Sequence, residues 1–168
     1  LGGLPLAIHI AAGHLAHSGW TPDAFLEHLR RRGLDVRPRD PADPLTAEGA
    51  RAVLSATFDL SLEALGAALG AEAAALLAGL GSLGYAPLAG VGRGLGAAIA
   101  GLDEDAFARL TSAARDHSLL EWEEPPPRLR VHPLLAEHLR ARTPPQAPLA
   151  RLSDWFLQRL PEPAPDAP

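Results

Sequence analysis

The sequence predicts a mainly α-helical fold, in which a helical hairpin is followed by a winged-helix domain with one small β-hairpin. Hydrophobic residues make up 47% of the 168 residues, and they are mostly Ala and Leu, which are strong helix formers. Aromatic residues make up only 5%, and β-branched residues are few, which argues against a large sheet. The order of the predicted elements, three helices and then two short strands, is that of a winged helix.

The first helix is predicted from Pro5 onward, because proline suits the first position of a helix. An apolar stripe at helical spacing follows, formed by Ile8, Ala11, Ala12 and Leu15. We expect this stripe to face the core. His14 and His17, three residues apart, are then expected on the solvated face, and two ligands are too few for a defined metal site.

A second helix completes an αα-hairpin within residues 1–33. Thr21 is the predicted N-cap and Pro22 the first helical residue, and the helix ends before Gly33. Its predicted buried residues are Phe25, Leu26 and Leu29. Residues 34–46 contain three prolines and five charged residues, which is typical of a linker or a surface loop.

The winged-helix domain is predicted over residues 47–142. Its first helices are expected at about 47–58, 61–69, 71–80, 93–100 and 104–116, the last of them capped by Asp103. The Gly-rich stretch 81–96 is interpreted as mostly loop, because glycine is costly inside helices. It is not interpreted as a phosphate-binding loop, because it has no Lys or Asp at a suitable spacing.

The end of the domain is predicted as a β-hairpin and a helix. Strands at about 118–122 and 128–131 flank a Pro-rich turn, and a helix follows at Pro133–Arg142. Residues 143–160 are expected to hold a linker and the start of a further helix, at about 149–160. Residues 161–168 contain four prolines and are expected to be disordered.

Composition and charge exclude several classes of function. All fifteen basic residues are Arg, and the chain has no Lys, Cys or Met, so disulfides, thiolate chemistry and Cys-based zinc sites are excluded. Because the sequence begins at Leu1 inside an apolar run, we expect it to be part of a longer chain. A net charge of −5 does not supply a basic nucleic-acid-binding face. No uninterrupted apolar run has membrane-spanning length and no signal peptide is visible, so we expect a cytoplasmic protein without a membrane partner.

Two motifs resemble one protein family. Gly3-Leu4-Pro5-Leu6-Ala7 resembles the GxP motif of the STAND ATPases, a class that includes the plant NB-ARC resistance proteins, the apoptosome scaffold and many bacterial regulators. About 125 residues later, Arg130-Val131-His132-Pro133-Leu134-Leu135 resembles the end of the winged-helix domain of that class. His132 falls where the plant proteins have the histidine of their Met-His-Asp motif. The resemblance covers roughly residues 1–142.

The resemblance implies a nucleotide-binding site made of Gly3, Leu4, Pro5, Leu6 and His132. In the family, ADP lies between a P-loop domain, the small helical domain and the winged helix. Pro5 would pack against the adenine with the backbone of its neighbours nearby, and His132 would hydrogen-bond the β-phosphate and lock the closed state. Exchange of ADP for ATP would release this lock and allow oligomerisation.

This sequence also departs from the family. A P-loop needs a Lys, which this chain lacks altogether. The Met and Asp of the plant motif are replaced by Val131 and Pro133. The chain alone is therefore expected to be no enzyme, without ATP hydrolysis and with at best very weak nucleotide binding.

The sequence thus predicts a non-catalytic switch module of a larger ATPase that binds ADP or ATP. Its expected partners are the P-loop domain of the same parent chain, C-terminal helical repeats or a sensor domain, and further copies of the parent in an oligomer. We expect a strand-end residue such as His132 to contribute little to stability.

The alternative is a winged-helix transcriptional regulator that binds DNA. Against it, the expected recognition helix at 91–102 offers only Arg93, and the wing tip carries Glu123 and Glu124, which would repel phosphates. A hydrolase is a third interpretation, but no nucleophile–base–acid set is apparent in the sequence.

Overall fold

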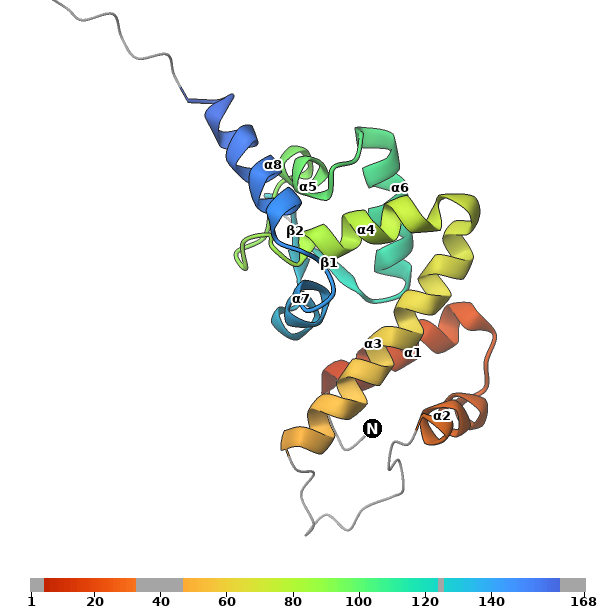
Figure 1. Cartoon of the computed structure of the whole chain (residues 1–168). Coiled ribbons are helices and arrows are strands. Elements are labelled where there is room, and N and C mark those ends of the chain that lie inside the picture. The colour runs from red at the N-terminus through yellow and green to blue at the C-terminus, as the bar shows by residue number, and fades with distance from the viewer. Residues whose placement is uncertain (1–4, 33–46, 124–125, 161–168) are drawn as a thin grey trace, which may run out of the picture.

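The computed structural model of this chain describes residues 5–32, 47–123 and 126–160, and it confirms the mainly α-helical fold with one two-stranded antiparallel hairpin (Figure 1). The predicted linker 34–46 and the predicted tail 161–168 lie outside the described residues. The elements are α1 (Pro5–Ser18), α2 (Pro22–Arg31), α3 (Ala47–Leu69), α4 (Ala73–Leu83), α5 (Arg93–Ala100), α6 (Glu104–Asp116), β1 (Leu120–Glu123), β2 (Arg128–Val131), α7 (Pro133–Arg140) and α8 (Gln146–Leu157).

Helix α1 begins at Pro5 as predicted, but it buries a different face. The buried residues are Ala7, Ile10, Ala11 and His14, whereas Ile8 is 51% exposed and Ala12 is exposed. Both sets have helical spacing, and the periodicity of an Ala-rich helix does not decide between them. The prediction that His14 lies on a solvated face is wrong, because His14 is only 2% exposed.

Helix α2 follows the prediction at both ends. The Thr21 hydroxyl accepts a hydrogen bond from the Ala24 N–H at 3.2 Å, and Pro22 is the first residue. Phe25 and Leu29 are buried and pack with Ala11 of α1 and Leu60 of α3 in a small core of their own. The αα-hairpin therefore lies against one helix rather than standing alone.

Helix α3 is a single helix of 23 residues, where the sequence predicted two shorter elements at 47–58 and 61–69. Ser61, the first residue of the predicted second element, lies within α3 and is fully buried. The helix ends at Gly70, whose φ of +58° is accessible to glycine at little cost.

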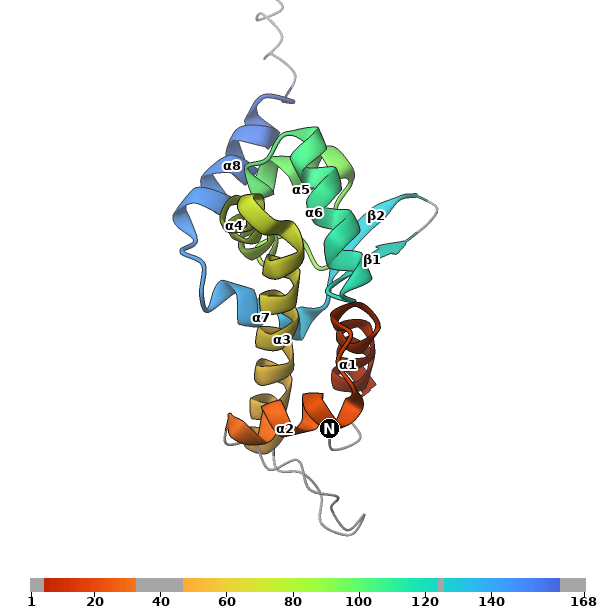
Figure 2. The same ribbon diagram turned by 90° about the vertical axis from the view of Figure 1, so that its right-hand side faces the viewer.

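The stretch Gly49–Leu83 is long and apolar enough to cross a membrane by length and composition alone, with a mean hydropathy of 1.6. Only 28% of its apolar 18-residue window is buried inside the fold, and a 3-10 turn at Gly70–Glu72 separates α3 from α4. Figure 2 shows α3 rising from the α1–α2 pair to the layer formed by α4, α5 and α6.

The second half of the chain forms three helices and a hairpin in the predicted order. Asp103 caps α6 as predicted, accepting a hydrogen bond from the Ala106 N–H at 2.7 Å. Strand β1 pairs antiparallel with β2, and Val91 adds an antiparallel bridge to Leu129 through two backbone hydrogen bonds of 2.8 and 2.9 Å. The hairpin is therefore joined to the loop that precedes α5.

The position of the expected recognition helix needs a correction. In a helix-turn-helix the second helix of the pair enters the DNA groove. Here the pair is α5 and α6, joined by a short turn at 101–103, and α6 is the helix that directly precedes the hairpin. The helix to compare with DNA-binding proteins is therefore α6 and not 91–102.

One large core joins most of these elements. It contains Ala7 and Ile10 of α1, Phe58 and Leu65 of α3, and buried residues of α4, α5, α6, both strands and α7. Helix α8 packs against this unit. The Arg151 guanidinium donates to the Ile99 carbonyl at 3.0 Å and to the Ser82 hydroxyl at 2.9 Å, which ties α8 to α5 and α4.

Candidate functional site

Only part of the predicted nucleotide site falls in the described structure. Gly3 and Leu4 lie outside the described residues, and Pro5 is the first residue of α1. Leu6 is half-buried and packs against the main core. The described residues of the GLPLA motif thus form the beginning of a packed helix.

His132 is the N-cap of α7. Its Nδ1 accepts a hydrogen bond from the Leu134 N–H at 3.2 Å, and Pro133 occupies the first helical position, where no N–H is needed. The side chain is half-buried. A capping residue satisfies a backbone N–H that would otherwise have no partner. The expectation that His132 contributes little to stability therefore does not fit its position.

The two motifs are connected through one core. Ala7, next to Leu6, and Val131, next to His132, are both buried in the large core cluster. The start of α1 and the start of α7 are thus parts of the same packed unit, although they are about 125 residues apart in sequence.

A polar cluster that sequence reasoning missed lies between α3 and α7. Ser55 and Asp59 are four residues apart on α3 and both face His138 of α7. The Ser55 hydroxyl lies 3.4 Å from His138 Nδ1, and Asp59 Oδ1 lies 3.0 Å from His138 Nε2. Arg142 pairs with Asp59 at 2.8 Å and also contacts His138 Nε2. The i, i+4 spacing of Ser55 and Asp59 was the signal available in the sequence.

This Ser–His–Asp chain has the residue types of a nucleophile, a base and an orienting acid. Ser55, however, lies in the middle of α3, where backbone N–H groups bond to carbonyls one turn earlier and are not free to form an oxyanion hole. Arg142 also engages the carboxylate that would orient the histidine. We therefore assign the cluster a structural role, as a polar tie between α3 and α7.

The pKa of His138 is lowered from 6.5, mainly because its burial disfavours the charged imidazolium and also because the Arg142 charge is close. The negative charge of Asp59 raises the pKa of His138, but by less than these two effects lower it. At neutral pH the histidine is therefore uncharged, and Arg142 is the cation that balances Asp59.

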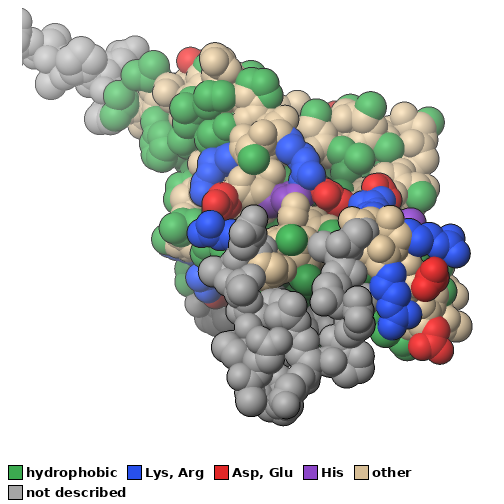
Figure 3. Space-filling view, turned by 60° about the horizontal axis from the view of Figure 1, so that its bottom comes forward, with side chains coloured by type: hydrophobic (Ala, Val, Ile, Leu, Met, Phe, Trp, Pro, Cys, Tyr) green, Lys and Arg blue, Asp and Glu red, His purple; other side chains and the backbone are tan. Residues whose placement is uncertain are grey.

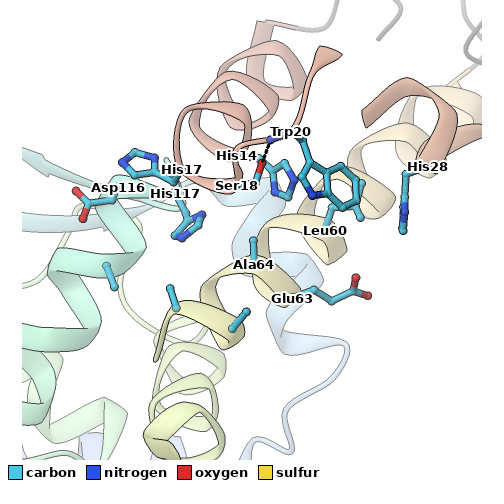
Figure 4. A pocket seen from close by; sticks show the side chains of 13 residues that line it. His14, His17, Ser18, Trp20, His28, Leu60, Glu63, Ala64, Asp116 and His117 are labelled. Carbon is cyan, nitrogen blue, oxygen red and sulfur yellow. Dashed lines mark hydrogen bonds between the residues drawn. The ribbon is translucent and has the colours of Figure 1, made fainter. Parts of the chain in front are cut away.

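A hollow with a polar lining lies elsewhere, between α1, α2, α3 and the end of α6. Its volume is about 570 Å³. Figure 4 shows His14 and Ser18 of α1 with Trp20, which follows that helix, on one side, His17 of α1 and His117 on another, and Ala64 of α3 below them. Sequence reasoning missed this pocket because its lining comes from four separate elements.

Two histidines of this pocket are buried without partners. His14 is 2% exposed and His117 is 4% exposed. Among the described residues, nothing hydrogen-bonds either ring nitrogen of His14 or Nδ1 of His117. The pKa of each is lowered from 6.5, chiefly by burial, and by the neighbouring histidines His117 and His17 respectively.

Within the described ranges, no group of three or more His, Asp or Glu side chains is arranged to hold a metal ion. The expectation of no metal site from His14 and His17 stays a prediction for the chain as a whole.

Comparison with protein-family models, with curated proteins and with solved structures gives no match to this chain. The family resemblance therefore depends on the two motifs and on the order of the elements.

Proposed function

We propose that this chain is a non-catalytic regulatory module of a larger STAND-type nucleotide-switch ATPase, in which His132 senses bound ADP. The observation that carries this proposal is the orientation of the His132 imidazole. Its Nδ1 accepts the Leu134 N–H, so in the neutral ring the proton resides on Nε2. Nε2–H is then a donor that the cap leaves available for a phosphate.

The position of His132 at the beginning of α7 also suits an anion. The N-terminus of a helix carries partial positive charge and attracts phosphate groups. A histidine donor and a helix N-terminus at the same place are a chemically reasonable contact for the β-phosphate of ADP. In the proposed site, Pro5 and Leu6 lie on the adenine side, as the family resemblance implies.

In the proposed mechanism, His132 contacts the nucleotide in the closed state of the parent but not in the open state. His132 would donate to ADP only when the winged helix is closed on the P-loop domain of the parent, and a contact made in one state shifts the equilibrium toward it. The P-loop domain, not this chain, would supply the chemistry of hydrolysis. We place this protein in the cytoplasm, where such a switch would find its nucleotides.

A further partner is proposed at the C-terminal end of the described chain. The exposed large apolar residues of α8 are Leu149, Phe156 and Leu157, with Leu160 directly after it. Figure 3 shows hydrophobic side chains gathered toward the end where the chain leaves the described fold. This surface suits the C-terminal helical repeats or sensor domain that we propose follow in the parent.

The test uses the full-length parent and two substitutions at His132. His132→Ala removes both the cap and the phosphate donor, whereas His132→Asn keeps a good N-cap but cannot reach as far. A charge-assisted hydrogen bond contributes about 1.5–3 kcal/mol, so both variants should lose ADP affinity by roughly tenfold or more. ADP affinity at the wild-type level in both variants would exclude His132 as the sensor.

A simpler observation tests the family itself. The hundred or two hundred residues that precede this segment in the parent should contain a GxxxxGK[ST] loop after a strand, since this chain has no Lys to serve as the phosphate-binding residue. A parent without such a loop would contradict the proposal.

The order of α5, α6 and the hairpin also favours the alternative, a DNA-binding regulator. The outward side of α6 argues against it. Its exposed residues are Glu104, Asp105, Arg109, Ser112, Arg115 and Asp116, and Arg109 is already paired with Glu72 at 3.0 Å. With three acidic residues and two arginines, this balance is acidic. The acidic side chains would repel the phosphates of a DNA backbone.

A further inference from the structure

We propose that the pocket between α1, α2, α3 and α6 is a binding site for a flat, uncharged, mainly apolar molecule with a hydrogen-bonding hydroxyl or amide group, which contacts His14 and His117. This site lies at the opposite end of α1 from the GLPLA motif and is independent of the proposed nucleotide switch.

The shape of the pocket favours a small flat ligand. Its volume of about 570 Å³ is within the range of small-molecule sites, roughly 300–1,000 Å³. Small side chains leave this space open, with Ala64, Ala67 and Ala68 on α3 and Ala113 on α6. Trp20 supplies an aromatic wall, and its ring packs edge-on against His14 with centroids 5.4 Å apart.

The two buried histidines supply the polar contacts. A neutral imidazole has one N–H donor and one acceptor nitrogen, and a buried polar atom without a partner is costly. Three ring nitrogens are in this state here, Nδ1 and Nε2 of His14 and Nδ1 of His117. Figure 4 shows both rings beside Ala64 in the hollow. These nitrogens lie under the wall of the hollow with less than 1 Å² of exposed surface each, so a ligand that both donates and accepts would pair with them once the side chains that cover them turn aside.

The pocket is held in shape by contacts outside it. Gly13 lets α1 approach the turn after α6, because a Cβ at Gly13 would lie 2.9 Å from Cβ of Ser118. This close approach brings His14 and His117 to the same space. On the other side, Arg32 at the end of α2 binds both carboxylate oxygens of Glu63 on α3, at 2.7 and 2.8 Å.

The charges around the pocket favour an uncharged ligand. The lining contains no Arg, and its acids are Glu63 and Asp116. Glu63 is neutralised by Arg32, while Asp116 is exposed beside His117. An anion would meet these carboxylates and lose its hydration without a cation to replace it, and burial near His14 also disfavours a cation.

The experiment uses three probes with the same ring system and the whole chain. 2-Naphthol is flat, uncharged and able to donate and accept, naphthalene lacks the hydroxyl, and 2-naphthoate is an anion. We expect calorimetry and ligand-observed NMR to show one site that prefers 2-naphthol to naphthalene by about threefold to tenfold, the value of one neutral hydrogen bond. 2-Naphthoate should bind less tightly than 2-naphthol.

Two variants and their controls locate the site. Ala64→Leu fills the pocket and should weaken 2-naphthol binding about tenfold or more, while Ala52→Leu on an exposed part of the same helix should not. His14→Phe should remove the preference for 2-naphthol over naphthalene, while His9→Phe on the exposed side of α1 should keep it. Circular dichroism checks that each variant folds.

The proposal is overturned if no probe saturates at millimolar concentration, which would mean that water alone fills the pocket. It is also overturned if 2-naphthoate binds as tightly as 2-naphthol, or if folded Ala64→Leu and His14→Phe variants bind both neutral probes as the wild type does.

Discussion

At the scale of single residues, histidines make the polar contacts on which our proposals depend, and these contacts did not follow from the sequence. His132 was placed by its motif, and its function as an N-cap came from the structure. His14 was misplaced because two helical faces of α1 have similar hydrophobicity, and burial against α2 and α3 decides between them. His138 and Ser55 meet across 83 residues, a distance at which no periodicity argument applies.

His132 gives a stability prediction on the isolated chain. Replacing a capping side chain by Ala costs about 0.5–2 kcal/mol, because a backbone N–H loses its partner. His132→Ala should therefore lower the free energy of unfolding by about 1 kcal/mol, and His132→Asn should restore most of it. Urea denaturation of the three proteins checks this. Equal midpoints for all three would mean that the cap contributes nothing.

At the scale of elements, the helices with strong end signals were predicted best. Thr21, Asp103 and Pro133 mark the starts of α2, α6 and α7, and each start lies where it was predicted. The helix α3 was predicted as two pieces, although the sequence has no Gly or Pro break between residues 58 and 61. Where the sequence has no strong local signal, contacts between residues far apart in the chain decide where a helix ends.

The tie between α3 and α7 predicts a contrast between two acidic residues. Asp59→Asn removes the charge that pairs with Arg142 and should destabilise the fold by about 1–3 kcal/mol, because the polar groups of a partly buried network lose their partner. Glu72→Gln breaks an exposed pair with Arg109 and should cost at most about 1 kcal/mol. Thermal unfolding of both variants tests this prediction. An equal loss of stability in the two variants would mean that the contact between α3 and α7 does not stabilise the fold more than an exposed ion pair does.

Helix α6 predicts the absence of specific DNA binding. Its exposed side has three acidic residues and two arginines, and the chain has a net charge of −5. Even non-specific binders reach about 10⁻⁴ to 10⁻⁶ M at physiological salt. Fluorescence anisotropy with a labelled duplex should show no complex tighter than this range. A tighter, salt-sensitive complex would make the DNA-binding regulator the better interpretation.

At the scale of the whole molecule, the fold class followed from composition and element order, while the pocket did not. An Ala/Leu-rich sequence with few β-branched residues leaves little alternative to helices. The packing of α1 and α2 on α3 decides which alanines line a hollow and which line the core, and this packing depends on side-chain volumes far apart in the sequence.

Two buried histidines, His14 and His117, and the half-buried His138 predict how global stability depends on pH. The pKa values of His14, His117 and His138 are lowered in the folded state, chiefly by burial, so the unfolded chain binds more protons below pH 6.5. The free energy of unfolding should be constant above about pH 7.5 and fall as the pH decreases through 6.5, before Asp and Glu titrate near about pH 4. Urea titrations from pH 8 to pH 5 test this.

The comparison variant for that titration is His14→Phe, which should show a shallower loss of stability between pH 7 and pH 5 because one proton-binding group is gone. A wild-type protein whose stability does not change over this interval would contradict the buried, uncharged state of the three imidazoles.

We propose that this chain closes on the P-loop domain of its parent when ADP is bound. The most direct measurement is calorimetric titration of the chain into the separately produced P-loop domain of its parent, with ADP or with a non-hydrolysable ATP analogue present. We expect a one-to-one complex that is tighter with ADP than with the ATP analogue by about tenfold or more, and that loses this difference in His132→Asn. A complex of equal affinity with both nucleotides, or no complex, would contradict the account.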